Sequence, residues 1–254
     1  MKTALLACVL TCSFYCYSQS NIPPVAVPPQ NVPYATKVNL TTDDEWFKDR
    51  RVNHYWEDSY VINGRRVFGS PFLYHDWETG EITTADGRLY TGYKLKYDAF
   101  NQVVYFTNGT GDSLQVDEEI KEFKLTVVYP DTVINCRLVN ANQFKKEKKS
   151  FYYEVLLDDA AGELLKYNKK IVADADKSMP AYEGKKFFDL EVSFFYYDKK
   201  NNSINPIKAN GSNITAILNL DDNLKNRLKP EGYDFSVEAN IVSFFRQYFE
   251  VLKK

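Results

Sequence analysis

The chain has 254 residues, with 32 basic and 34 acidic side chains and a formal net charge of −2. This balance, with no basic patch, argues against a nucleic-acid-binding protein. A chain of this length can bury a self-sufficient core, as one large domain or two small ones.

Residues 1–18 have the layout of a cleavable secretory signal. Lys2 precedes an apolar run from Ala4 to Tyr17, and the run ends at Ser18. At about fourteen residues it is shorter than the roughly twenty that a membrane-spanning helix needs. We expect cleavage after Ser18, a mature chain that begins at Gln19, and export to the periplasm, the outer membrane or the medium.

A lipid anchor is the alternative interpretation of the same segment. Leu5-Leu6-Ala7-Cys8 resembles a lipid-attachment box. However, only about three apolar residues precede it, where a signal should have about seven. The unlipidated signal is therefore favoured, and no later segment is long and apolar enough to predict a transmembrane span.

Cleavage at Ser18 would remove three of the four cysteines and leave Cys136 as the only thiol. The mature chain could then form no internal disulfide. The next segment, residues 19–42, holds five of the ten prolines between Asn21 and Pro33, a density that favours extended backbone. It is either a spacer or, as we favour, an untethered terminus.

Residues 43–211 alternate apolar and polar side chains between turn dipeptides, which predicts strands. The clearest run places Phe188, Leu190, Val192, Phe194 and Tyr196 on one face. Shorter runs are Leu89, Tyr93, Leu95 and Tyr97; Phe123, Leu125 and Val127; and Tyr153, Val155 and Leu157. Turns are predicted at Asn63-Gly64, Asp86-Gly87, Asn108-Gly109 and Asp198–Asn202. We expect a mainly β fold, an antiparallel meander that forms a curved sheet or partial barrel.

Residues 212–254 are predicted to form short helices that cover this sheet within the same domain. Ser212 or Asn213 is placed to cap a first helix, and Pro230 would end a second one. A third follows Ser236, with apolar residues at helical spacing. An apolar stripe of this kind is usually core, although it could instead fill a partner's groove.

Several short motifs resemble a family of exported proteins of the Bacteroidetes type that has no known activity. They are Gly69-Ser-Pro-Phe-Leu73, Trp77, Gly80-Glu-Ile-Thr83, Asp86-Gly87 and Leu95-Lys-Tyr-Asp98. The likeness continues weakly to the terminal helices and covers most of the mature chain. It implies an envelope or extracellular location and carries over no catalytic residue.

No motif for a nucleophile, phosphate, dinucleotide or metal emerges, and no cofactor is expected. His75, Asp76, Trp77 and Glu78 are weak candidates for a binding site because they gather an imidazole, two carboxylates and an indole. Metal binding there is disfavoured, since neighbouring residues on a strand point to opposite faces.

Two triplets resemble an O-glycosylation sequon, Asp112-Ser113-Leu114 and Asp131-Thr132-Val133. The possible sites are Ser113 and Thr132, provided that each lies on an exposed loop.

Three functional classes remain. The preferred one is an exported non-catalytic module that binds a protein or a glycan, because no catalytic motif is present and the sheet is rich in aromatic residues. A periplasmic carrier of an apolar ligand such as lipid is the alternative, and would need a cavity between sheet and helices. An enzyme with a scattered carboxylate site is less favoured.

Overall fold

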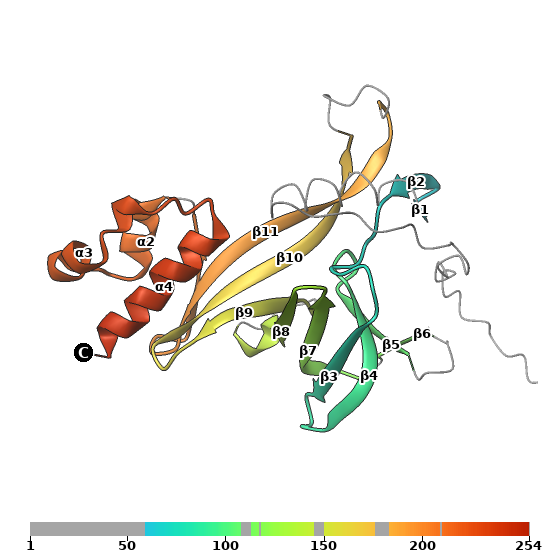
Figure 1. Cartoon of the computed structure of the whole chain (residues 1–254), viewed down its shortest axis with the longest axis horizontal. Helices are drawn as coiled ribbons and strands as arrows, with labels where there is room; N and C mark the ends of the chain where they lie inside the picture. Colours follow the sequence, from blue (N-terminus) through green and yellow to red (C-terminus); the bar gives the residue numbers. More distant parts are fainter. Residues whose placement is uncertain are drawn as a thin grey trace, which may run out of the picture. The chain divides into compact units, whose positions relative to one another are not determined.

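A computed structural model of the chain describes residues 59–107, 113–116, 118–144, 150–175, 183–208 and 210–253. The predicted signal peptide over residues 1–18, the Pro-rich segment over 19–42 and the predicted Asn108-Gly109 turn lie outside the described residues. Most described residues belong to one large, mostly antiparallel sheet that is curved and does not close, with three short helices at its C-terminal end (Figure 1). The predicted fold class is confirmed.

The strands are β1 (Ser59–Ile62), β2 (Arg65–Phe68), β3 (Glu78–Thr84), β4 (Leu89–Asp98), β5 (Val103–Thr107), β6 (Ser113–Gln115), β7 (Ile120–Tyr129), β8 (Thr132–Asn140), β9 (Tyr152–Asp158), β10 (Gly162–Asp174), β11 (Lys186–Asp198) and β12 (Ser203–Ile207). The helices are α2 (Gly211–Ile217), α3 (Asp222–Leu228) and α4 (Glu238–Leu252), with 3₁₀ turns η1 (Ala141–Gln143) and η3 (Pro230–Gly232).

Short turns join most neighbouring strands, as expected of a meander. Asn63 and Gly64, between β1 and β2, have φ angles of 50° and 74°, the positive values that a two-residue hairpin needs. The order across the sheet is β1-β2-β11-β10-β9-β8-β7-β3-β4-β5-β6, and β12 pairs with β11. Two contacts depart from the meander: β3 pairs antiparallel with β7, and β2 pairs with β11 in parallel, at Lys186 and Phe187.

A bulge in β4 interrupts the alternation of inward and outward side chains that the sequence predicts. The pairing of β3 with β4 shifts at Gly80 and Glu81, opposite Gly92, which has a φ of +78°. The extra residue moves the N-terminal part of β4 by one position, so Tyr90 packs on the core and Leu89 is 61% exposed. The prediction that Leu89 lies on the same face as Tyr93 is wrong for this reason.

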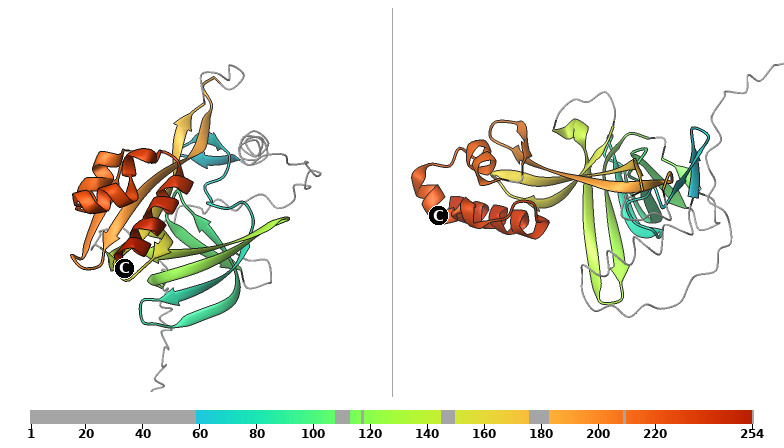
Figure 2. Two further views of the ribbon diagram at one scale, coloured as in Figure 1. Left: turned by 60° about the vertical axis from the view of Figure 1, so that its left-hand side comes forward. Right: turned by 90° about the horizontal axis from the view of Figure 1, so that it is seen from above.

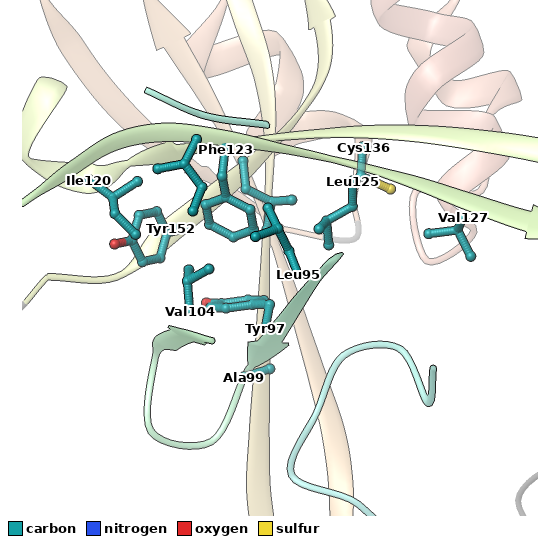
Figure 3. Close-up of a cluster of buried hydrophobic side chains, with 12 residues drawn as sticks. Leu95, Tyr97, Ala99, Val104, Ile120, Phe123, Leu125, Val127, Cys136 and Tyr152 are labelled. Carbon is teal, nitrogen blue, oxygen red and sulfur yellow. The ribbon is translucent and has the colours of Figure 1, made fainter. Parts of the chain in front are cut away.

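The inner face of the curved sheet holds an aromatic core, which Figure 3 shows in close-up. The rings of Tyr97, Phe123 and Tyr152 have centroids 5.0 to 5.8 Å apart, in tilted or edge-to-face contacts. Such geometry adds to the stabilisation that burial itself gives. Leu95 and Leu125 complete this core at 0% and 1% exposure.

The helices cover one face of β9, β10 and β11 with a second core (Figure 1; Figure 2, left). α4 contributes Phe244, Phe245 and Tyr248, and Phe245 packs on the ring of Tyr196 from β11, 5.5 Å between centroids. Asn210 caps α2 by accepting a hydrogen bond from the backbone N–H of Asn213, so the cap precedes the predicted Ser212 or Asn213. In the described part of the chain no helix is long and apolar enough to cross a membrane.

Candidate binding surface

The outer face is the side of β3, β4, β5, β7 and β8 that points away from the core around Phe123. Strand register arranges its side chains in rows that cross the sheet. Lys96 of β4 lies opposite Tyr105 of β5, and Trp77, just before β3, continues the register on the other side of Lys96. Phe72 joins this row through a contact with the Tyr105 ring.

We call Phe72, Trp77, Lys96 and Tyr105 the aromatic row. The Lys96 ammonium lies 4.5 Å from the ring centroid of Phe72 and 5.8 Å from that of Trp77, a cation–π arrangement. The Phe72 and Tyr105 centroids are 6.2 Å apart. All four side chains are partly exposed, so three aromatic rings reach solvent in one place.

Polar side chains occupy the neighbouring rows, and most are held in place by one another. The Lys94 ammonium donates to Thr79 Oγ1 at 2.9 Å, and the Lys124 ammonium donates to Glu81 Oε2 at 3.2 Å. The hydroxyl of Thr126 donates to Asn135 Oδ1 at 3.2 Å. These contacts reduce the rotamer freedom that a ligand would otherwise have to remove.

A shallow hollow of about 370 Å³ lies among these polar rows. Gly80 and Gly92 line it without side chains, and Glu81, Lys124 and Arg137 are among its other lining residues. A Cβ on Gly80 would overlap Leu95 and the carbonyl of Lys124, so close packing of β3 between its neighbours requires glycine there.

The structure separates the four predicted site residues. Trp77 belongs to the aromatic row, whereas Glu78 lies opposite Leu95, a core residue. His75 and Asp76 are exposed, with His75 Nε2 4.0 Å from Asp76 Oδ1. The described residues contain no group of three or more His, Cys, Asp or Glu side chains that could hold a metal ion.

The two possible glycosylation sites are both exposed. Ser113 begins β6, and Thr132 begins β8 directly after the tight turn at Asp131. Asp112 lies outside the described residues.

Cys136 belongs to a buried polar cluster on the other side of β8. The Tyr74 hydroxyl lies 2.9 Å from its sulfur, and burial together with the negative charge of Glu154 raises the pKa of the thiol to about 12. Glu154 accepts a hydrogen bond from Asn168 at 2.8 Å and lies 3.8 Å from the Lys166 ammonium. A thiol that stays protonated at neutral pH is a poor nucleophile.

Sequence reasoning singled out Trp77 but missed Phe72, Lys96, Tyr105 and the polar rows. The outward positions of β4, Lys94 and Lys96, were visible as the polar half of an alternating run. Their neighbours come from β3, β5 and β7, and only the register across the strands brings them together. No protein family, curated protein or solved structure matches this chain.

Proposed function

We propose that the protein is an exported, non-catalytic module that binds a glycan on the outer face of its sheet. The observation that carries the proposal is the aromatic row, three partly exposed rings around Lys96, beside a hollow lined by polar side chains. The sequence signals of residues 1–18 and the resemblance to exported proteins of the Bacteroidetes type support the location.

A sugar matches this chemistry because it has an apolar C–H face and a rim of hydroxyl groups. The face of Trp77 or Tyr105 offers contact area with little entropy to lose on binding. Thr79, Lys94 and Asn135 offer donors and acceptors for the hydroxyl groups, at exposed positions of the adjacent rows. Binding sites for small ligands typically combine an apolar surface with a few polar groups at fixed positions.

The carrier alternative needs an apolar cavity between the sheet and the helices. Side chains of α4 fill that space, where Phe244 and Phe245 are both 0% exposed. The alternative of a scattered carboxylate site fits less well on the outer face, because Glu81, Glu122 and Asp158 are each ion-paired with Lys124 or Arg137.

The test is a glycan array followed by isothermal titration with the oligosaccharide that binds best. Trp77→Ala should weaken binding at least tenfold, about 1.4 kcal/mol or more, because a stacked aromatic anchor is lost. Leu89→Ala is the matched control, an exposed apolar residue at the far end of β4, and should leave the affinity unchanged. Equal affinity for both variants, or no binding to any glycan on the array, would contradict the proposal.

A further inference from the structure

The strand β8 has an edge that the described part of the chain leaves open. It pairs with β7 from Thr132 to Val139, but with β9 only from Leu138 to Asn140. The yellow-green hairpin of β7 and β8 extends beyond β9 in the right-hand view of Figure 2. From Thr132 to Arg137, no described strand pairs with β8 on the β9 side.

The alternation of backbone hydrogen bonds along β8 shows which N–H and C=O groups point out of this edge. The N–H of Ala141 donates to the carbonyl of Phe151 at 2.8 Å, so odd-numbered residues of β8 direct their backbone groups toward the β9 side. At the open edge these are Val133, Asn135 and Arg137. An edge of this kind is a ready template for another strand.

Side chains around the edge do little to prevent pairing. Val128 is 69%, Val133 55% and Ile134 40% exposed, and neither charge nor proline interrupts residues 132–136. Two other short strands at the margins are better protected: β12 carries Pro206, and β6 has only three residues.

We propose that this edge pairs antiparallel with the same edge of a second copy of the chain, with the two-fold axis at Ile134. Each Val133 then lies opposite Asn135 of the other copy, and both residues exchange backbone hydrogen bonds across the axis. The two Ile134 side chains face each other. Asp131, in the exposed turn, comes opposite Arg137 of the other copy.

Self-complementarity is what favours a second copy over a strand of another protein. In this register apolar side chains meet at the axis, as an isologous interface allows, and at both ends Asp131 joins Glu122 and Asp158 around Arg137. Moving the axis to Asn135 would instead place Val133 opposite Arg137. The dimer would also place the outer faces of the two copies side by side, which would extend the proposed binding surface. The dimer proposal does not depend on the proposed function.

Sedimentation of the exported chain, made in a host that does not glycosylate it, tests the dimer. Wild type should dimerise below about 100 μM. Ile134→Lys should raise the dissociation constant at least tenfold, because it places two ammonium groups together at the axis. Leu190→Lys is the matched control, because Leu190 is also 40% exposed, on β11, and it should dimerise as wild type does. A monomeric wild type, or an unaffected Ile134→Lys dimer, would overturn the proposal.

Disulfide trapping tests the register itself. Ile134→Cys places two thiols at the axis, so mild oxidation with diamide should link the two copies. Val133→Cys lies off the axis, opposite Asn135, and should give little linked product; wild type, whose Cys136 is buried, should give none. More linkage through Val133→Cys than through Ile134→Cys would refute the register and with it the axis at Ile134.

Discussion

Cys136 shows how strongly surroundings set the chemistry of one side chain. It is buried, its sulfur lies 2.9 Å from the Tyr74 hydroxyl, and Glu154 adds a negative charge nearby. Both burial and the carboxylate disfavour the thiolate, which raises the pKa from the ordinary thiol value of 9.0 to about 12. The thiol should therefore be inert in the folded protein.

We predict that Cys136 makes the protein less stable as the pH rises from 9 to 12. Over this range the unfolded thiol loses its proton while the folded thiol keeps it, so ionisation favours unfolding, by about 4 kcal/mol at most. Urea denaturation measures the free energy of unfolding of wild type and of Cys136→Ala. The difference between the two should be constant below pH 9, and above pH 9 the wild type should lose stability relative to Cys136→Ala.

A reagent specific for thiols provides the second measurement on Cys136. Ellman's reagent at pH 8 should react slowly with the folded protein and quickly in urea, because only unfolding exposes the sulfur. Rapid reaction of the folded protein, or a free-energy difference that does not change with pH, would show that the thiol is not held as described.

Lys166 lies on β10 and forms an ion pair with Glu238 in the first turn of α4. Its ammonium is 2.9 Å from a carboxylate oxygen of Glu238 and 3.8 Å from one of Glu154. The Lys166 and Glu154 side chains are 17% and 12% exposed, whereas that of Glu238 is 43% exposed. The buried carboxylate of Glu154 therefore relies on this cation more than Glu238 does.

We predict that Lys166→Ala lowers the free energy of unfolding by about 3 kcal/mol or more, because it leaves Glu154 buried without its cation. Glu238→Gln keeps a hydrogen-bond acceptor at an exposed position and should cost no more than about 1 kcal/mol. Urea denaturation followed by circular dichroism measures both. Equal, small losses in the two variants would mean that the buried carboxylate of Glu154 does not rely on Lys166.

Local sequence patterns predicted the individual strands and helices better than the contacts between them. The period of two in residues 188–196 predicts β11, and the apolar spacing after Ser236 predicts α4. The bulge at Gly92 could not be read from alternation, because an isolated glycine in a strand fits several roles. The parallel contact of β2 with β11 joins segments far apart in the chain, and no local pattern encodes it.

The candidate site was predictable only in part for the same reason. Trp77 stood out as an aromatic residue in a polar loop, but Lys96 and Tyr105 read simply as strand residues. Lys96 and Tyr105 lie side by side because of the register between β4 and β5, and a single sequence does not determine that register.

For the molecule as a whole, we predict that the exported protein begins at Gln19 and carries no lipid. The apolar run that ends at Ser18 is the reason, since it has the length and flanks of a cleavable signal. Intact-mass spectrometry of the protein from the envelope fraction measures this. A mass that corresponds to a chain starting at Cys8 with a diacylglycerol would instead make the protein a lipoprotein.

The central claim is that the outer face of the sheet binds a glycan, and chemical-shift mapping tests it most directly. Titration of the ¹⁵N-labelled protein with the oligosaccharide selected on the array should shift the indole N–H of Trp77 and the backbone amides of Lys94, Lys96 and Tyr105. Amides of α4, such as that of Phe245, should not move. Shifts confined to the helices or to the inner core, with the Trp77 indole unchanged, would contradict the claim.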